Sequence, residues 1–570
     1  MFTRVVSATC LLTACASAPK PAPNLAPQPS AASENAHAHE HTASSWTLQG
    51  LAKGAVLLPD LGSYKRPVTT SAPEAQAFFD QGLALSYGFN HDEAARSYAR
   101  AAEIDPSCAM CFWGVAYTLG PNYNIPMLPE RAHAAWDAIT RAREAAATHA
   151  SPVEKALIQA LAKRYKGPEY VDPVAMAAFN RAYADAMREV ASSFGDDLDV
   201  QALYAEALMN VDPWKLWNAD GSPASGTTDI VAALENVLAK APDHPGANHF
   251  YIHAVEASQT PARALPSAER LAALIPGAGH VVHMPAHIFQ RVGRYADASR
   301  ANERAIEIDE QYLRTVTPPG YYPFYLAHNH GFLAYSASME GRGARALEAA
   351  RKSAGAMPRD IVCGMPGMDF FLSEPLLVMV RFGRFEELLR EPEPSAQTPV
   401  LRALYHHARG MALAATGKPE AARAELEALQ ASMQAIPEDM LAGLNAGRLV
   451  LALASKVLGA RIAEATRDPG AIAQWQAAVS LEDQLAYNEP ADWFYPVRHY
   501  LGAAQLDAGK AKDAEATYRA DLLRNPSNGW ALYGLWQALL AQKHKAAKQA
   551  EQDFRSAWKN ADIELTRSAF

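Results

Sequence analysis

Apolar and small residues recur along the chain at the spacing of paired amphipathic helices. In the clearest copy, a frame that starts at Ala75 places apolar or small residues at positions 4, 8, 11, 20, 24 and 27 and a proline at position 32. These residues are Phe78, Gly82, Leu85, Ala94, Tyr98, Ala101 and Pro106. Small residues at positions 8 and 20 let two helices cross closely, and the proline ends the second helix. The pattern predicts a helical hairpin.

The same frame returns later in the chain. Units begin at Pro245, Gly279 and Ala327, and two C-terminal units run through Gly410 to Leu426 and Leu501 to Pro526. This spacing is that of the tetratricopeptide repeat (TPR), a unit of about 34 residues. One hairpin cannot bury its apolar stripe alone, so repeats stack into a superhelix with a concave groove. We therefore expect an all-α fold, a TPR helical-hairpin superhelix or α-solenoid.

The repeat frame and the composition divide the chain into five parts. The chain leaves the frame at Gly120-Pro121-Asn122, and residues 120–240 are expected to be helical but irregular, with a turn-like stretch from Asn218 to Pro223. Either an insertion or degenerate repeats would explain this. The expected parts are a lipoprotein signal peptide (1–14), a flexible histidine-containing tether (15–48), an N-terminal TPR and irregular helical region (49–240), a central TPR region with a histidine cluster (241–390) and a C-terminal TPR region (391–570).

The N-terminus has the pattern of an export signal. Arg4 precedes an apolar run from Val5 to Leu12, and Leu12-Thr13-Ala14-Cys15 resembles the lipobox of bacterial lipoproteins, in which the cysteine is lipidated. Ordinary signal cleavage near Ala18 is the alternative. We expect Cys15 to anchor the protein in the cell envelope. Because residue 16 is alanine and not aspartate, we expect the outer membrane, on its periplasmic side.

The expected tether is rich in Pro, Ala, Ser and Asn, a composition that cannot bury enough surface to fold. It contains His37, His39 and His41. Alternating imidazoles on a flexible chain can chelate divalent metals. A chance polar run is the alternative.

Charge and motifs narrow the function classes. The chain has 570 residues with a net charge of −9, so it carries no electrostatic footprint for nucleic acid. It contains no phosphate loop, nucleophile elbow or HExxH motif. We therefore expect no nucleotide cofactor and no nucleic-acid partner.

Histidines recur at matching positions of two neighbouring units. His249 and His283 are 34 residues apart, and so are His253 and His287. Histidines at i and i+4 share a helix face, and equivalent positions of adjacent repeats lie on neighbouring helices. Histidine pairs with a carboxylate are a common way for helices to hold Zn, Cu, Fe or Mn. The predicted metal ligands are His249, His253, Glu256, His280, His283 and His287.

Pro285 makes the register of the second histidine unit ambiguous. Proline is tolerated in the first turn of a helix, so the helix could begin either near Gly279 or near Pro285. The second start would leave His280 and His283 in a capping loop. A polar groove for a peptide or small molecule, or simple packing, would also explain the histidines.

Further residues are candidates for the same concave groove. Aromatic side chains can line a binding site, although at helical spacing they more often form core. The additional candidates are His328, His330, His91, Trp214 and Trp217.

Cys108 and Cys111 form a CxxC pair followed by Phe112. Because no histidine follows, the haem-attachment motif fails and we expect no haem. A local disulfide or redox pair remains open, but we favour two small unbonded residues that open a helix.

Several stretches also resemble a group of secreted bacterial TPR proteins with no established activity. They are Gly88 to His91, Ala109 to Gly114, Gly120 to Asn124, Asn248 to Ser258, Gly279 to Ile288 and Tyr518 to Leu535. The resemblance implies a TPR fold and an exported location, and it implies no chemistry.

The preferred hypothesis is a membrane-anchored TPR protein-interaction protein whose concave groove binds a peptide or protein and carries the His/Glu metal site. The alternative is a periplasmic metal-dependent enzyme or metal-delivery protein that uses the same groove. The sequence leaves open whether the protein is an enzyme.

Overall fold

The computed structural model describes residues 46–316, 321–358, 362 and 364–570, and this part of the chain is almost entirely helical. The helices up to the central region are α1 (Leu48–Ala52), α2 (Pro73–Tyr87), α3 (His91–Ile104), α4 (Ala109–Leu119), α5 (Ala132–Ala146), α6 (Pro152–Leu161), α7 (Pro173–Ser193), α8 (Leu198–Met209), α9 (Thr227–Lys240), α10 (Pro245–Val255), α11 (Leu265–Leu274), α12 (Gly279–His283), α13 (Pro285–Arg291), α14 (Tyr295–Thr315), α15 (Tyr322–Met339) and α16 (Gly343–Ala356).

The C-terminal half continues in the same way. Its helices are α18 (Glu374–Arg381), α19 (Phe385–Leu388), α20 (Pro399–Ala415), α21 (Pro419–Gln434), α22 (Gly447–Ala465), α23 (Ala471–Glu482), α24 (Val497–Asp507), α25 (Ala511–Arg524), α26 (Gly529–Ala541) and α27 (Ala547–Ala557). Short 3-10 turns lie at Pro129–Arg131, Ala162–Arg164, Pro261–Ala264 and Met368–Ser373. Strands β1 (Leu441–Ala442) and β2 (Asn445–Ala446) form a small antiparallel ladder.

Consecutive helices pack as hairpins, and at two crossings the ring of a buried tyrosine packs against glycines of the neighbouring helices. The ring of Tyr98 on α3 lies between Gly82 on α2 and Gly114 on α4, where a Cβ would come within 2.7 Å and 2.3 Å of it. Tyr518 on α25 lies in the same way between Gly502 and Gly534, with distances of 2.4 Å and 2.1 Å. A methyl group has no room at these crossings. The predicted TPR superhelix is confirmed.

Residues 120–240 also form helices that pack in sequence. Each helix from α5 to α10 contacts the next one. The turn-like stretch belongs to a loop between α8 and α9, where Asn218 N–H donates to the Ser222 carbonyl and Trp217 pairs with Pro223 in a single β-bridge. The region therefore extends the stack as irregular hairpins with one long loop.

The histidine-rich helix begins at Gly279, before Pro285. Met284, between α12 and α13, has helical backbone angles (φ −50°, ψ −36°), and its N–H donates to the His280 carbonyl. Pro285 therefore lies inside a nearly continuous helical segment that runs from α12 into α13. A helix start near Pro285, with His280 and His283 in a capping loop, is wrong.

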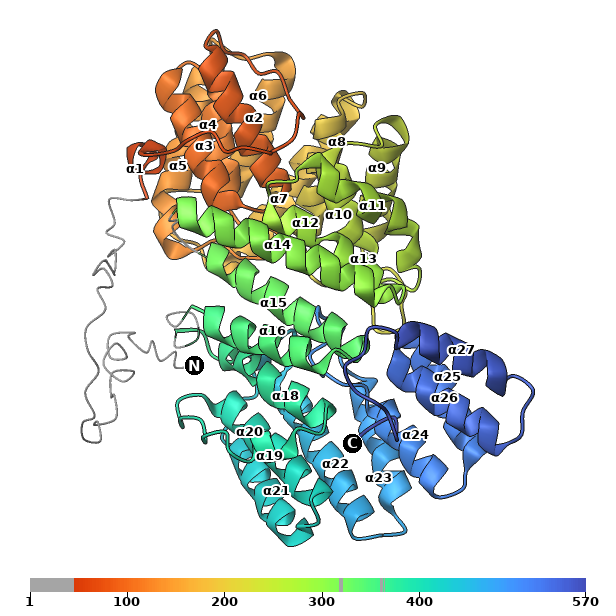
Figure 1. The fold of residues 1–570 in the computed structure, drawn as a ribbon. Helices are drawn as coiled ribbons and strands as arrows, with labels where there is room; N and C mark the ends of the chain where they lie inside the picture. The colour runs from red at the N-terminus through yellow and green to blue at the C-terminus, as the bar shows by residue number, and fades with distance from the viewer. Residues whose placement is uncertain (1–45, 317–320, 359–361, 363) are drawn as a thin grey trace, which may run out of the picture.

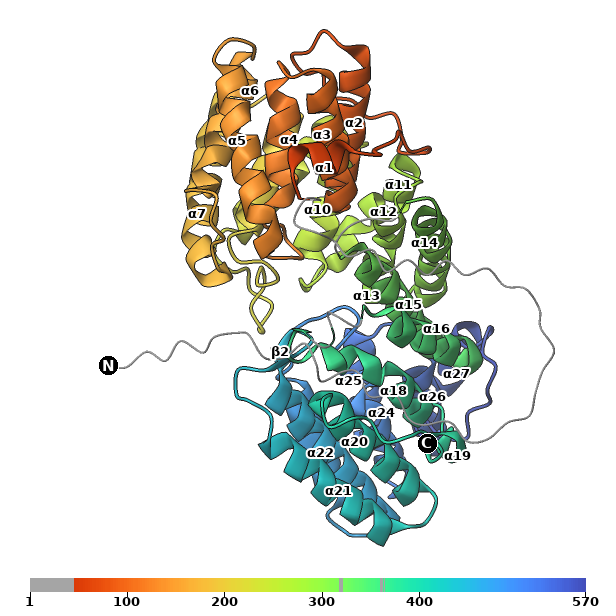
Figure 2. The same ribbon diagram turned by 90° about the vertical axis from the view of Figure 1, so that its left-hand side faces the viewer.

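Two large hydrophobic cores lie on either side of the central helices. One gathers residues from Trp46 to Phe332, and the other from Tyr295 to Ala569. Figures 1 and 2 show the corresponding halves stacked, with α14, α15 and α16 between them. The C-terminal repeats fold back onto this centre, because Trp530 Nε1 donates to the Ser338 carbonyl and Asp562 accepts from the N–H groups of Gly343 and Ala344.

The N-terminal repeats also reach the central helices. Tyr312 OH donates to Glu93 Oε2 (3.1 Å), and Asn122 Nδ2 donates to Tyr321 OH (3.4 Å). The superhelix thus curls until α3 and the segment after α4 touch the end of α14 and the start of α15. Segments separated by about 200 residues meet there.

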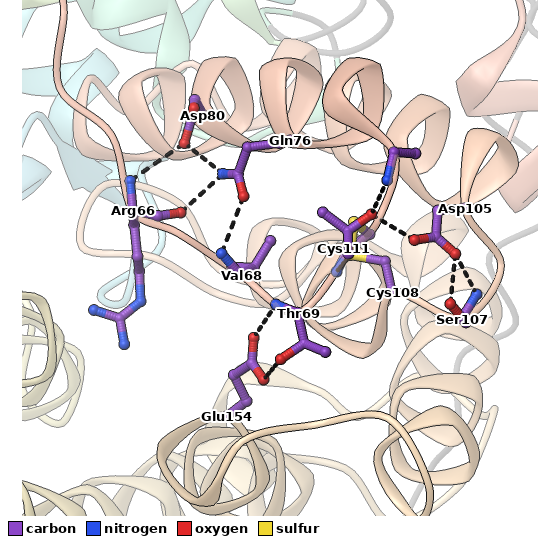
Figure 3. Close-up of a disulfide and its surroundings, with 12 residues drawn as sticks. Arg66, Val68, Thr69, Gln76, Asp80, Asp105, Ser107, Cys108, Cys111 and Glu154 are labelled. Atoms are coloured by element: carbon purple, nitrogen blue, oxygen red, sulfur yellow. Dashed lines mark hydrogen bonds between the residues drawn. A yellow bond between two sulfur atoms is a disulfide. The ribbon is translucent and has the colours of Figure 1, made fainter.

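Cys108 and Cys111 form a disulfide, with their Cα atoms 5.4 Å apart (Figure 3). Cys108 is the N-cap of α4, and both residues are fully buried. The unbonded interpretation is therefore wrong, although the pair does open a helix. In Figure 3 the bond lies next to Asp105, whose carboxylate accepts from Ser107 and Thr70 at the hairpin junction.

Among the described residues, no helix is both long and apolar enough to cross a membrane. The predictions for Cys15, the signal peptide and the tether histidines His37, His39 and His41 fall outside the described residues.

Candidate metal centre

Six histidines from four helices converge between the N-terminal and central repeats. His249 and His253 lie one turn apart on α10, His280 and His283 on α12, His287 on α13 and His328 on α15. All are buried except His328, which is half-buried. Their ligand atoms form two triads, each within 4.8 Å: His249, His253 and His280, and then His283, His287 and His328.

In the first triad, neighbouring acceptors fix which nitrogen carries the proton. His249 Nδ1 lies 2.5 Å from the Tyr87 carbonyl, which can only accept, so Nδ1 is the donor. His253 Nδ1 lies 2.9 Å from Glu256 Oε1 and is fixed in the same way. The Nε2 atoms of both rings therefore carry free lone pairs. Neither Nε2 has a hydrogen-bond partner among the described residues, and His280 has none on either nitrogen.

The second triad has the same arrangement. His283 Nδ1 lies 2.7 Å from Asn302 Oδ1, and Asn302 Nδ2 donates to the Ala298 carbonyl, which fixes the orientation of the amide. His283 Nδ1 is therefore a donor. The Nε2 atoms then face one another: His283 lies 2.7 Å from His287 and 3.2 Å from His328.

Two carboxylates contact His287 at Nδ1, the ring nitrogen that faces away from the triad. Its Nδ1 lies 2.6 Å from Glu256 Oε2 and also contacts Glu489, which reaches the cluster from the loop between α23 and α24. Glu256 uses its other oxygen for His253, so it contacts one histidine of each triad. Such carboxylate–imidazole contacts orient metal-binding histidines and raise their basicity.

Burial keeps most of these imidazoles neutral. It lowers the pKa of His253 and of His328 to about 3 and holds the pKa of His249, His280 and His283 well below the ordinary value. Burial opposes the charge of His287 too, but Glu489 and Glu256 raise its pKa to about 10. Burial and the nearby Glu256 raise the pKa of Glu489 to about 7. Neutral imidazoles keep the lone pairs that a metal needs.

Outside the cluster, buried histidines differ in how far they are paired: His91 Nε2 and His330 Nδ1 each lack a hydrogen-bond partner among the described residues, whereas both nitrogens of His407 have one. His407 pairs through Nδ1 with the Ala454 carbonyl (2.9 Å) and through Nε2 with Tyr495 OH (2.7 Å). Leaving a buried donor or acceptor unpaired costs about 1–3 kcal/mol, so several unpaired nitrogens in one place are not explained by packing alone.

Aromatic rings close the cluster on one side. Phe89 stacks on His253 and His280, with ring centroids 5.6 Å and 5.7 Å away, and the ring of Tyr325 lies 4.7 Å from His280. Phe89 has a positive φ of 55° at the turn that ends α2, where Asn90 N–H donates to the Leu85 carbonyl.

A cleft of about 580 Å³ opens next to the cluster, between the halves of the molecule. His253 and Glu256 form part of its wall, opposite residues of α23, α25 and the loop that carries Glu489. Four lining atoms lack hydrogen-bond partners among the described residues: Gln290 Oε1, Glu482 Oε2, Tyr487 OH and Trp493 Nε1. These residues line the cleft near the histidines, while the four unpaired atoms themselves are buried.

The structure brings together all six predicted ligands, with Glu256 between the triads, and adds His328 to them. Trp214 and Trp217 line the cleft, and the Trp214 ring lies 5.8 Å from that of His253. His91 and His330 lie apart. His91 is behind Phe89, where Asn122 Nδ2 donates to its Nδ1, and the charges nearest to His330 belong to Arg345, Glu348 and Lys352 on α16.

Sequence reasoning missed Glu489 and Asn302. Glu489 precedes Pro490 in a loop without periodic pattern, and Asn302 lies on the second helix of its hairpin. Nothing in their spacing connects them with the histidine units.

The fold and the cluster together define a TPR-type α-solenoid with a buried histidine–carboxylate centre. No family model matches the chain, and no curated protein matches it. Among solved structures, yeast Tom70 aligns over 85% of this chain and 97% of its own, with 12% identity and a TM-score of 0.33. Ypp1 aligns over 86% and 82%, with 8% identity and a TM-score of 0.43. The P58(IPK) TPR domain aligns over 82% and 98%, with 12% identity and a TM-score of 0.22. At such values the likeness carries no inference about function.

Proposed function

We propose that this protein is a metal-binding TPR scaffold. It holds a divalent transition metal in the His/Glu cluster, takes a peptide or protein ligand in the adjoining cleft, and is anchored in the cell envelope through Cys15. One observation carries the metal site: His249 and His253 are fixed with Nδ1 as donor and leave Nε2 unpaired among the described residues, and the Nε2 atoms of His287 and His328 both lie within 3.2 Å of His283 Nε2. This arrangement is unfavourable without a shared proton or cation and favourable around a metal.

The ligand atoms limit which metal ions the site can bind. Imidazole nitrogen suits Zn, Cu, Fe and Ni, and it suits Mg and Ca poorly. Three histidines leave at least one coordination position open in a four-coordinate site. The proposed ion is therefore a borderline transition metal with room for one more ligand.

The test is the metal content of the purified full-length chain. His37, His39 and His41 are replaced by alanine in every sample, so that the tether cannot contribute ligands. We expect stoichiometric metal by inductively coupled plasma mass spectrometry, a strong loss in His253→Ala and in His287→Ala, and no loss in the exposed control His149→Ala. Protein that binds no Zn²⁺, Cu²⁺, Fe²⁺, Ni²⁺ or Mn²⁺, as purified or after loading, would overturn the proposal.

A metal-dependent enzyme is the second candidate. It is favoured by the cleft, where unpartnered polar atoms of Gln290, Tyr487 and Trp493 share a wall with His253. An ion next to that wall could polarise a bound molecule or activate water. Peptide binding that is independent of the loaded metal would favour the scaffold, whereas turnover of a small molecule that stops on chelation would favour the enzyme.

A further inference from the structure

We infer that the cluster binds two ions side by side, one in each histidine triad. This inference rests on the proposed metal-binding function and specifies its nuclearity. The first site consists of His249, His253 and His280, and the second of His283, His287 and His328. The two triads share no residue.

Ligand distances favour two ions over one. Metal–imidazole bonds are about 2.0–2.1 Å, so two nitrogens on one ion can be at most about 4.2 Å apart. Within each triad the ligand atoms lie within 4.8 Å of one another, a span that a small side-chain adjustment closes. The six histidines form two such groups, and each supplies the three imidazoles of an open four-coordinate site. A third group within the same limit, His253, Glu256 and His287, takes one histidine from each triad and joins them through Glu256.

The Nε2 atoms of the second triad converge, and His283 and His287 need to move apart by only about 0.6 Å to reach the ~3.3 Å between ligands of a tetrahedral site. Its Nε2 atoms are separated by 2.7 Å (His283 to His287) and by 3.2 Å (His328 to His283). The Nδ1 atoms of His283 and His287 are held from behind by Asn302 and by the two carboxylates. An ion between the three Nε2 atoms would leave these outer contacts intact.

The first triad has ligand nitrogens that no hydrogen bond from the described residues occupies. His249 and His253 present free Nε2 atoms, with their ring centroids 5.0 Å apart, and the centroid of His280 lies 5.0 Å from that of His249. His280 has no partner on either nitrogen among the described residues, so it loses no hydrogen bond when it turns. This unpaired, fully enclosed ring is the strongest sign that the first triad is a site in its own right.

The two sites are neighbours joined by Glu256. The ring centroids of His253 and His287 are 5.5 Å apart, and those of His280 and His283 are 5.8 Å apart. Glu256 binds Nδ1 of His253 with one oxygen and Nδ1 of His287 with the other, so it holds one ligand of each site. Glu256 and Glu489 also bring two carboxylates next to two dications, which offsets their mutual repulsion.

The test counts ions and measures their coupling in the full-length chain that lacks the tether histidines. Titration of the metal-free protein with Cu²⁺ should reach two ions per chain. Two adjacent Cu²⁺ ions couple magnetically, so we expect an electron paramagnetic resonance signal well below two spins per chain. His280→Ala and His328→Ala should each bind one ion and give the full signal of an isolated Cu²⁺.

His330→Ala is the matched control, because it lies on the same helix as His328 and outside the cluster. It should still bind two coupled ions. Circular dichroism and the titration of the parent chain, which keeps all six cluster histidines, separate loss of a site from loss of the fold. One ion per chain, or two ions with full uncoupled spin intensity, would overturn the two-ion inference and leave the metal-binding proposal standing. No bound ion at all would overturn both.

Discussion

His283 and His287 face each other through their Nε2 atoms, which lie 2.7 Å apart. Both rings have Nδ1 committed as a donor, His283 to Asn302 and His287 to Glu256 and Glu489. One proton or one cation must therefore lie between the two lone pairs. The chain arranges this by placing the histidines one helical turn apart and by bringing in acceptors from α14 and from the loop before α24.

Glu489 should strengthen metal binding without being a ligand. Removal of a carboxylate that orients a metal-binding histidine typically costs about 10–100-fold in affinity. We therefore expect Glu489→Gln to weaken Zn²⁺ binding by about that factor, measured by competition with a chromophoric chelator. Asp483→Asn, on the same segment but in a surface ion pair with Arg498, is the control and should keep wild-type affinity. Equal affinities in wild type and Glu489→Gln would contradict the assigned role.

The crossing of α3 between α2 and α4 should tolerate no side chain at Gly114. A Cβ there would come within 2.3 Å of the Tyr98 ring, and overpacking of a buried site costs about 1–3 kcal/mol. Gly114→Ala should lower the free energy of unfolding by that amount, measured by urea denaturation. Gly355→Ala on α16 is the control, because nothing lies within 4 Å of its Cβ and alanine is the better helix former. It should be neutral or stabilising by up to about 1 kcal/mol.

The repeat spacing predicted the fold and the histidine set because both depend on local periodicity. Matching positions of successive hairpins lie on neighbouring helices. The 34-residue spacing therefore predicted that His249 lies near His283, and His253 near His287. The same logic could not choose between His328 and His330. Residues two apart on a helix point to different sides, and the contact between His328 Nε2 and His283 Nε2 shows that His328 joins the cluster. The contact between Glu489 and His287 could not be predicted from the repeat spacing, because it depends on how far the superhelix curls.

The CxxC disulfide should contribute modestly to stability. It closes a four-residue loop, for which the chain-entropy estimate is about 2 kcal/mol. We expect Cys108→Ala/Cys111→Ala to lower the free energy of unfolding by about that amount. Alkylation of the denatured, unreduced protein should leave both cysteines unlabelled by mass spectrometry, and the control Cys363→Ala should not change this. Labelling of Cys108 or Cys111 without a reductant would show that the bond is absent.

Asp309 should make stability depend on pH in a defined direction. The side chain is fully buried, accepts from Tyr322 OH (2.6 Å) and Asn329 Nδ2 (2.7 Å), and contacts no cation among the described residues. Burial raises its pKa to about 7. An unfolded aspartate ionises near pH 3.9. Between about pH 4 and 7 the native state therefore holds a proton that the unfolded state has lost, so stability falls as the pH rises, by at most about 1.4 kcal/mol per unit.

Asp309→Asn should remove this part of the pH dependence. Asparagine stays neutral, and its NH₂ can donate to the Tyr322 hydroxyl oxygen, so the buried hydrogen bonds can be kept. The free energy of unfolding of Asp309→Asn, relative to wild type, should increase steadily from pH 5 to 7 and then level off, as measured by urea denaturation at each pH. The exposed control Asp243→Asn should follow the wild-type profile. Parallel profiles for wild type and Asp309→Asn would mean that Asp309 ionises alike in the folded and unfolded chains, and the assigned direction would then be wrong.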